Sequence, residues 1–237
     1  MYATVREVGD APAGTREVVL DVTDAAAVAQ AAAGIEELDA LVDNAGIGIA
    51  GPLEVLPLDA LSRQLEVNVV GQLRVTQALL PALRRRRGRI VIMGSISGRS
   101  ALPFLGAYAM SKFALEALAD SLRLELAPWG MHVALVEPGT IATAIWTKPQ
   151  QAAEALPPQA LALYGDRIAQ FRALAAKRAA AAGVPAADVA RAVEHALTAK
   201  KPRTRYLVGP DAKRRARLER LPDRIRDRVL TRFLFPA

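Results

Sequence analysis

Hydrophobic and polar residues follow two alternating patterns along this chain. Short apolar runs rich in β-branched residues, typical of strands, occupy residues 1–6, 16–22, 38–44, 89–93, 131–137 and 205–208. Apolar positions at helical spacing occupy stretches between them, at residues 25–33, 59–85, 112–126, 158–182 and 186–199. Strands that alternate with helices favour a parallel sheet with helices on both faces, so the pattern predicts an α/β fold.

The composition is that of a single globular domain. The chain has 237 residues, of which 52% are hydrophobic and 23% charged, enough for a sizeable core. It has no cysteine, which excludes disulfides and thiolate chemistry, and its two histidines, His132 and His195, form no metal-ligand cluster. No apolar run approaches the ~20 residues of a membrane span, and the first residues lack the apolar core of a signal peptide. We therefore expect a cytoplasmic protein without a metal site.

The net charge of +7 is concentrated at one end of the chain. From Ala199 onward there are 13 Lys or Arg against 4 Asp or Glu, whereas the remainder has 18 against 20 and is about neutral. A basic tail on a neutral domain does not indicate nucleic-acid binding.

The tail itself, residues 211–237, alternates arginines with apolar residues and predicts a basic amphipathic helix. The simplest interpretation is that this helix packs its stripe of Leu221, Ile225 and Val229 on the domain. Two alternatives are that it lies on an anionic membrane, with residues 233–235 inserted, or that it binds a protein partner.

Tyr108 and Lys112 are the residues that most clearly indicate catalysis. They lie four residues apart, one helical turn, and therefore share a face. A fixed ammonium beside a phenol lowers the pKa of the phenol from its usual value near ~10, which makes Tyr108 a usable general acid or base. Ser95 follows the buried strand at 89–93 and can hydrogen-bond the same substrate oxygen. The pair alone is equally compatible with a core tyrosine and a solvated lysine, so other motifs must decide.

Four further motifs occur in order around this pair. They are Asp-Asn-Ala-Gly at 43–46, Asn-Val-x-Gly at 68–71, Gly-Ser-x-Ser-Gly at 94–98 and Pro-Gly at 138–139. With Tyr108 thirteen residues after Ser95, this order resembles the short-chain dehydrogenase/reductases over residues 1–199. Residues 102–104 and 111–116 are similar to the hydroxysteroid and retinol dehydrogenase branch. The resemblance implies a Rossmann-like, doubly wound parallel sheet.

The resemblance assigns roles to a catalytic tetrad. Tyr108 would be the acid/base, Lys112 would lower its pKa and hydrogen-bond the nicotinamide ribose, and Ser95 would orient the substrate carbonyl or hydroxyl. Asn68 would hold a water in a proton relay; the plain alternative is a polar residue in a helix bend. The implied reaction is reversible hydride transfer between a nicotinamide cofactor and a carbonyl or alcohol carbon.

The resemblance also implies a set of cofactor contacts. These are Asp21 and Val22 at the adenine, the turn Asn44, Ala45 and Gly46 beside the adenine ribose, and Tyr108, Lys112, Pro138, Gly139 and Thr143 at the nicotinamide end. At the end of the first strand, Arg6 offers a guanidinium suited to the 2′-phosphate of NADP, where an acidic residue would favour NAD. The sequence therefore favours NADP. The alternative is that Arg6 is a solvated strand-end charge and that NAD is used.

One motif of the family is absent from this sequence. No Thr-Gly-x-x-x-Gly-x-Gly turn occurs, and Met1 falls where the family has its second strand. We therefore expect an N-terminally incomplete sheet without its first βα unit, in which the strand at 1–6 has no neighbour linking it to the strand at 38–44. Two explanations are open: the sequence begins late, or the sheet closes differently, with weak or no dinucleotide binding.

Two functions are compatible with these features. The favoured one is an NADP(H)-dependent oxidoreductase of a lipophilic alcohol, ketone or aldehyde, with its site in a domain at 1–210 and its substrate pocket at 144–183. The alternative is a non-catalytic scaffold that keeps the fold and uses its tail for a membrane or a partner. The resemblance further implies a homodimer or homotetramer through the helices at 59–85 and 112–126.

Overall fold

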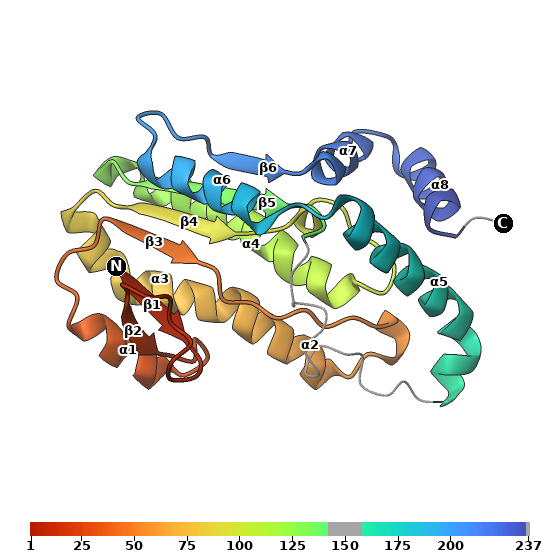
Figure 1. Ribbon diagram of the computed structural model, residues 1–237, viewed down its shortest axis with the longest axis horizontal. Coiled ribbons are helices and arrows are strands. Elements are labelled where there is room, and N and C mark those ends of the chain that lie inside the picture. The colour runs from red at the N-terminus through yellow and green to blue at the C-terminus, as the bar shows by residue number, and fades with distance from the viewer. Residues whose placement is uncertain (142–157, 236–237) are drawn as a thin grey trace.

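The computed structural model describes residues 1–141 and 158–235, apart from the side chains of residues 178–182 (Figure 1). Thr143, expected at the nicotinamide, and the first part of the expected substrate pocket, residues 144–157, lie outside the described residues.

The strands form two separate parallel sheets. Strands β1 (Tyr2–Val5) and β2 (Arg16–Val19) pair with each other and make up the first sheet. The second sheet has the order β3 (Ala40–Asp43), β4 (Arg89–Met93), β5 (His132–Pro138) and β6 (Arg205–Val208). The first sheet lies beside the β3 side of the second, next to α1 (Figure 1). Among the described residues, β1 pairs only with β2 and β3 only with β4, so the expected break between β1 and β3 is confirmed.

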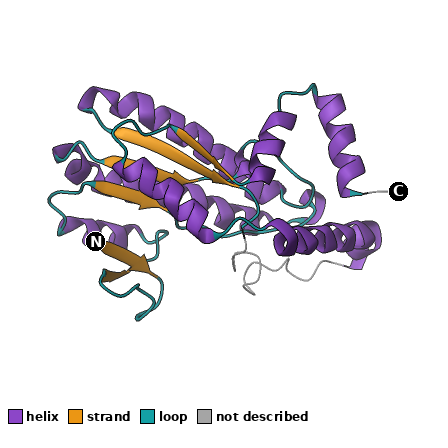
Figure 2. Ribbon diagram, turned by 45° about the horizontal axis from the view of Figure 1, so that its top comes forward, coloured by secondary structure: helices purple, strands orange, loops and turns teal. Residues whose placement is uncertain are grey.

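Eight α-helices are described, and helices lie on both faces of the second sheet, α3 and α4 on one and α6 on the other (Figure 2). Their bounds are α1 (Ala25–Ala33), α2 (Leu58–Leu65), α3 (Gln72–Arg85), α4 (Gly106–Leu126), α5 (Pro158–Ala182), α6 (Ala186–Thr198), α7 (Pro210–Leu218) and α8 (Asp223–Leu234). Asp24 caps α1 as expected, because its carboxylate accepts hydrogen bonds from the backbone N–H groups of Ala26 and Ala27.

The long helix expected at 59–85 contains an irregular turn. Between α2 and α3 lies η2 (Glu66–Gly71), a π-helical turn that includes Asn68. Such turns shift the helix register by one residue and occur frequently at functional sites. Asn68 therefore lies in a helix irregularity, and this position is compatible both with a functional residue and with a polar residue in a helix bend.

Alternation along β4 divides the core between two helical layers. Ile90 and Ile92 face α3 and α4, where they join Leu83, Leu115 and Leu135 in one buried cluster. Val91 faces the other side, in a cluster with residues of β5, β6 and α6. A strand buried on both faces is characteristic of a parallel sheet, and the predicted α/β fold is confirmed.

The basic C-terminal region differs from the expectation in two ways. It forms two helices instead of one. Pro222 lies between them, at the N-cap of α8, and proline has no backbone N–H with which to continue a helix. The Leu221, Ile225 and Val229 stripe does not pack on the domain: these side chains are 37%, 50% and 39% exposed. The side of α8 that packs inward instead carries Leu234, which is buried. Among the described helices, none is both long and apolar enough to cross a membrane.

Asp43 gives the fold a predicted dependence on pH. It is buried at the end of β3, and burial raises its pKa to about 7 although Thr76 donates a hydrogen bond to it. In the unfolded chain an aspartate titrates near ~3.9. Between these values the unfolded state releases a proton that the folded state retains, so stability falls as pH rises through this window.

The substitution Asp43→Asn removes the titrating group and keeps an acceptor for Thr76. We expect the parent to lose roughly 2 kcal/mol of unfolding free energy between pH 5 and pH 7, and the variant to lose much less. Urea unfolding across this pH range measures both slopes. Parallel slopes in the two proteins would show that Asp43 is not responsible.

Candidate active site

Ser95 and Tyr108 meet at the carboxyl end of β4. Ser95 follows β4 directly and begins the short helix η3 (Ile96–Gly98), where its hydroxyl accepts a hydrogen bond from the Ser97 backbone N–H at 3.1 Å. A Cβ at Gly98 would lie 2.7 Å from the carbonyl oxygen of Lys112, so only glycine lets η3 pack this closely on α4. The second glycine of the Gly-Ser-x-Ser-Gly motif therefore brings Ser95 next to the first turns of α4.

The environment of Tyr108 pulls its pKa in two directions. Burial raises the pKa of this phenol, whereas a hydrogen bond with the Ser95 side chain and the positive charge of Arg215 lower it. The net direction is upward, which differs from the expectation that Lys112 brings the pKa down. The reason is that burial of Tyr108, which is only 8% exposed, outweighs the favourable contacts.

Lys112 is buried beneath Tyr108 on the same face of α4. Its Nζ donates a hydrogen bond to the backbone oxygen of Met93, the last residue of β4, at 2.8 Å, and lies 5.7 Å from the centroid of the Tyr108 ring. Burial lowers the pKa of Lys112 to about 8. The group is therefore charged at pH 7, and the helical spacing that predicted this pair is confirmed.

Asn68 is tied to the same turn of α4 by hydrogen bonds. Its side-chain amide donates to the Ser111 hydroxyl at 3.0 Å and to the backbone oxygen of Ile47 at 2.9 Å, and its oxygen accepts from the Ile47 N–H at 2.8 Å. The Ser111 hydroxyl in turn donates to the Tyr108 backbone oxygen at 2.8 Å. Asn68 thus joins η2, the loop after β3 and the Tyr108 turn.

Two further buried amides, Gln64 and Gln72, hold the same loop and were missed in the sequence. Gln64 exchanges hydrogen bonds with Ile47 and Ile49, and Gln72 donates to the backbone oxygen of Ala45 at 2.8 Å. With Asn68 between them, these amides recur every four residues along α2, η2 and α3. That spacing was the available signal, because it places three polar side chains on one helix face.

Asp21 and Val22, expected at the adenine, and Arg6, expected at the 2′-phosphate, follow the ends of the two strands of the first sheet. The Arg6 guanidinium is 3.8 Å from the Asp21 carboxylate, so the ends of β1 and β2 bring these two residues together. Val22 is held from the other side, since Arg74 donates to its backbone oxygen at 2.6 Å and Gly71 of η2 packs against its side chain. Hydrogen bonds from Thr23 to its carboxylate lower the pKa of Asp21, and Arg6 adds to this effect.

Helix α7 contacts the site at Pro138 and Gly139, where the nicotinamide is expected, and the sequence did not predict this contact. Pro138 and Gly139 end β5, and the next residue, Thr140, donates its backbone N–H to the Asp211 carboxylate at 2.6 Å. A Cβ at Gly139 would collide with this carboxylate, so the glycine permits the contact. One turn later, Arg215 donates a hydrogen bond to the Ser100 backbone oxygen beyond η3. One helix therefore binds the segments after both β4 and β5.

The donors at these positions fit a dinucleotide. Lys112 has three donor hydrogens, of which the Met93 oxygen takes one, so a ribose hydroxyl can be bound by another. The Arg6 side chain is 72% exposed and can turn its donors to a phosphate. Asn44, Ala45 and Gly46, expected beside the adenine ribose, directly follow β3.

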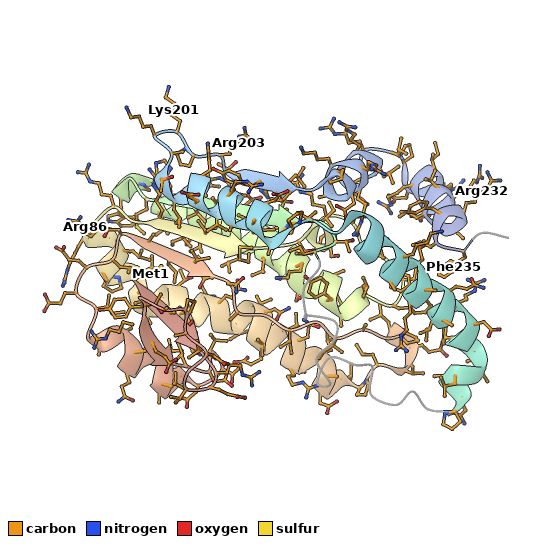
Figure 3. The ribbon with its side chains drawn as sticks, in the orientation of Figure 1. Met1, Arg86, Lys201, Arg203, Arg232 and Phe235 are labelled. Atoms are coloured by element: carbon orange, nitrogen blue, oxygen red, sulfur yellow. The ribbon has the colours of Figure 1, made fainter. Side chains whose placement is uncertain are left out.

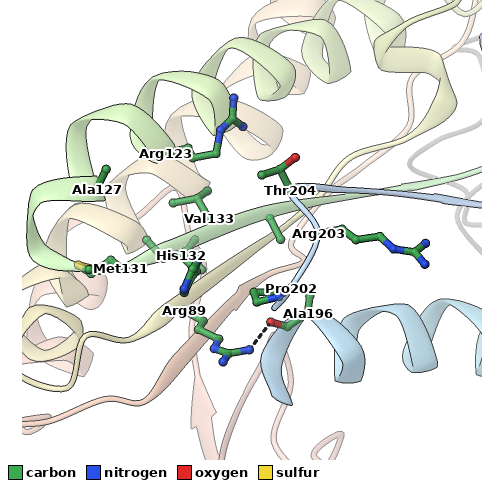
Figure 4. A pocket seen from close by; sticks show the side chains of 13 residues that line it. Arg89, Arg123, Ala127, Met131, His132, Val133, Ala196, Pro202, Arg203 and Thr204 are labelled. Carbon is green, nitrogen blue, oxygen red and sulfur yellow. Dashed lines mark hydrogen bonds between the residues drawn. The ribbon is translucent and has the colours of Figure 1, made fainter. Parts of the chain in front are cut away.

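A cavity of about 250 Å³ lies at the opposite end of the second sheet, where β4 and β5 begin (Figure 4). Its lining includes Arg89, Arg123 and Arg203. The Arg89 guanidinium donates to the backbone oxygen of Ala196 at 3.0 Å, and those of Arg123 and Arg203 point away from each other. These cations do not converge on one ligand, and the cavity is not part of the candidate site.

Comparisons with known proteins agree with this geometry. Residues 2–154 match the family model described as short chain dehydrogenase. Human 17-beta-hydroxysteroid dehydrogenase type 1 is 38% identical over 87% of this chain and 64% of its own length. NADPH-dependent 3-dehydrocapnine reductase of Ornithobacterium rhinotracheale is 34% identical over 97% of this chain and 86% of its own. The chain thus spans a little under two thirds of the human relative.

Solved structures show the same fold. A short-chain dehydrogenase from Streptomyces avermitilis superposes with a TM-score of 0.80 at 29% identity, covering 98% of this chain and 86% of that one. A short chain dehydrogenase from Burkholderia cenocepacia in complex with NADP has a TM-score of 0.72 at 27% identity, covering 100% and 86%. With the motifs, the fold and these matches in agreement, the chain belongs to the short-chain dehydrogenase family.

Proposed function

We propose that this protein is an NADP(H)-dependent oxidoreductase that interconverts an alcohol and a ketone or aldehyde on a lipophilic substrate. The observation that carries the proposal is the meeting of Ser95, Tyr108 and Lys112 at the carboxyl end of β4, with Asn68 bound to the same turn of α4. A phenol, a hydroxyl and an ammonium around one buried point provide acid/base chemistry for a substrate oxygen.

In the proposed reaction the bound cofactor supplies or accepts the hydride. In the direction of reduction, the Tyr108 hydroxyl donates its proton to the substrate oxygen, and the Ser95 hydroxyl donates a hydrogen bond to the same oxygen. The Lys112 ammonium and the Arg215 guanidinium then stabilise the negative charge left on Tyr108. Oxidation reverses these steps, with the Tyr108 phenolate as the base.

The preference for a lipophilic substrate is supported by an aromatic cluster beside the site. Phe104 precedes α4, and its ring lies edge to face with Tyr164 at 6.2 Å, Phe171 at 5.8 Å and Phe235 at 6.4 Å between ring centroids. Aromatic walls favour apolar ligands. The human relative is by name a hydroxysteroid dehydrogenase, an enzyme of a largely apolar substrate.

The preference for NADP is supported by Arg6 and by two related proteins. The Ornithobacterium reductase is NADPH-dependent, and the Burkholderia structure contains NADP. In this chain the exposed Arg6 guanidinium is the group suited to a 2′-phosphate.

Isothermal titration of NADPH and NADH into the 237-residue chain tests the proposal. We expect NADPH to bind about tenfold more tightly than NADH, since a charge-assisted contact to the 2′-phosphate contributes on the order of 1.5 kcal/mol. Arg6→Ser should remove this difference, whereas Arg16→Ser, an exposed arginine on the neighbouring strand, should not. Equal affinities in the parent would overturn the NADP assignment. A folded chain that binds neither dinucleotide would overturn dinucleotide binding by the 237-residue chain and favour the alternative of a non-catalytic scaffold.

We also propose that the chain forms a homodimer or homotetramer through α3 and α4. Exposed apolar side chains on and beside these helices, Val70, Met110 and Phe113, support this assembly.

A further inference from the structure

Helix α8 carries a row of apolar side chains that are largely exposed to solvent. Ile225, Val229 and Phe233 are spaced by four residues and are 50%, 39% and 57% exposed, and Leu221 continues the spacing just before the helix. Residues four apart lie on one helix face. Ile225, Val229 and Phe233 are here called the α8 ridge.

The packing of α8 on the domain uses a different face of the helix. Leu234 is buried, and Phe235, which follows it, contacts the Phe104 ring and lies under the Arg167 guanidinium of α5. Phe235 points toward α5, whereas Arg232 points outward (Figure 3). The ridge therefore lies on the outer face of α8, whose other side is already packed against the domain.

A row of cations follows the ridge along one side. Arg224, Arg228 and Arg232 are exposed and are also spaced by four residues, and two of them stand three residues after Ile225 and Val229, on neighbouring surface positions. Within the part of the chain that the structure describes, none of these three arginines forms an ion pair. The acidic residues of the helix, Asp223 and Asp227, are instead paired with Arg226 at 3.1 Å.

We propose that the α8 ridge is a docking surface for an anionic lipid bilayer. An apolar row flanked by exposed arginines suits the boundary between acyl chains and headgroups, where the apolar side chains enter and the guanidiniums bind lipid phosphates. Residues 210–235 contain 9 Lys or Arg against 4 Asp or Glu, so the whole region is attracted to negative charge.

A second copy of the chain fits this surface less well than a bilayer does. Two ridges meeting about a two-fold axis would bring two arginine rows together, and charged residues are depleted from the cores of protein interfaces. Three half-exposed side chains also provide much less than the ~800 Å² per partner of a stable interface. A bilayer needs neither shape complementarity nor a large area.

Cosedimentation of the full chain with vesicles tests the proposal. We expect binding to phosphatidylcholine vesicles that contain phosphatidylserine, and little binding to phosphatidylcholine alone. Replacing Arg224, Arg228 and Arg232 by Gln should weaken binding about 100-fold, since each surface cation contributes about fivefold. Ile225→Ser with Val229→Ser should weaken binding as well, because the ridge no longer enters the bilayer.

A matched control separates the ridge from net charge. Lys200, Lys201 and Arg203 are exposed at the other end of the molecule, and Lys201 and Arg203 project there away from α8 (Figure 3). Replacing these three cations by Gln removes the same charge and should leave vesicle binding within about twofold. Equal losses in the two triple variants would overturn the proposal, as would full binding by the Ile225→Ser/Val229→Ser variant.

Sedimentation velocity of the same proteins tests the competing occupant. All the replaced side chains are exposed, so circular dichroism should show unchanged folding. A dimer that is lost in the Ile225→Ser/Val229→Ser variant, without vesicle binding by the parent, would assign the ridge to a second copy. None of these measurements depends on enzymatic turnover, so their outcome is independent of the function proposed above.

Discussion

Tyr108→Phe is expected to lower the turnover number for carbonyl reduction with NADPH by about 10³-fold. The substitution removes the hydroxyl that transfers its proton to the substrate oxygen in the proposed mechanism, and a positioned acid or base contributes about 10²- to 10⁴-fold to the rate. The ring remains, so the buried packing of Tyr108 among η3 and α4 is kept. Steady-state kinetics over a set of lipophilic ketones and aldehydes, with titration of NADPH, measures the effect.

The same measurement distinguishes loss of chemistry from loss of structure. Dinucleotide affinity and the thermal unfolding midpoint should change little in Tyr108→Phe. Tyr2→Phe, on the first sheet, is a matched control that removes a tyrosine hydroxyl from an exposed position, and its turnover should equal that of the parent. Full activity in Tyr108→Phe would rule out this residue as the acid/base.

Arg99→Ala is expected to destabilise the fold by about 3–5 kcal/mol at pH 8. Glu137 is fully buried on β5, and the Arg99 guanidinium donates two hydrogen bonds to its carboxylate. Removing one partner of a buried ion pair leaves the other charge without compensation, which is far more costly than losing the attraction itself. Urea unfolding of the parent and the variant measures the difference.

A neighbouring carboxyl makes this penalty dependent on pH. Glu116 of α4 lies against Glu137, and burial, followed by the charge of Glu137 and a hydrogen bond with it, raises the pKa of Glu116 to about 8. Because the Arg99 charge lowers the pKa of Glu116, the Arg99→Ala variant should hold the Glu116 proton to higher pH, and its stability should fall as pH rises through that range. Arg86→Ala breaks an exposed pair with Asp39, whose attraction is screened by solvent, and should destabilise the fold far less than Arg99→Ala does. Similar costs for the two substitutions would contradict the role assigned to Arg99.

The Arg99 pair also connects the two segments that carry the site. Arg99 follows the turn that presents Ser95, and Glu137 precedes Pro138 and Gly139. This ion pair therefore ties the segment after β4 to the end of β5. Helix α7 contacts the same two segments through Thr140 and Ser100.

The sequence by itself determined most of the elements of this protein and the residues of its candidate site. Strand and helix patterns depend on local periodicity, and the Tyr108 and Lys112 pair depends on a single helical turn, so both are readable from short stretches. The break between β1 and β3 also followed from the sequence, because it depends on which strands are present and in what order.

Only the tertiary structure decided how distant segments act on the site. Burial reversed the expected direction of the Tyr108 pKa, and the cations near it include Arg215, more than a hundred residues away. Two other sets of contacts likewise join residues far apart in the chain: the hydrogen bonds from Gln64 and Gln72 to the loop after β3, and the ion pair of Arg99 with Glu137. The same applies to α8. Its sequence places apolar residues on two sides of the helix, and only the folded structure shows that the side with Leu234 is buried and the ridge is exposed. Desolvation and long-range contact depend on the folded arrangement, and no local pattern encodes them.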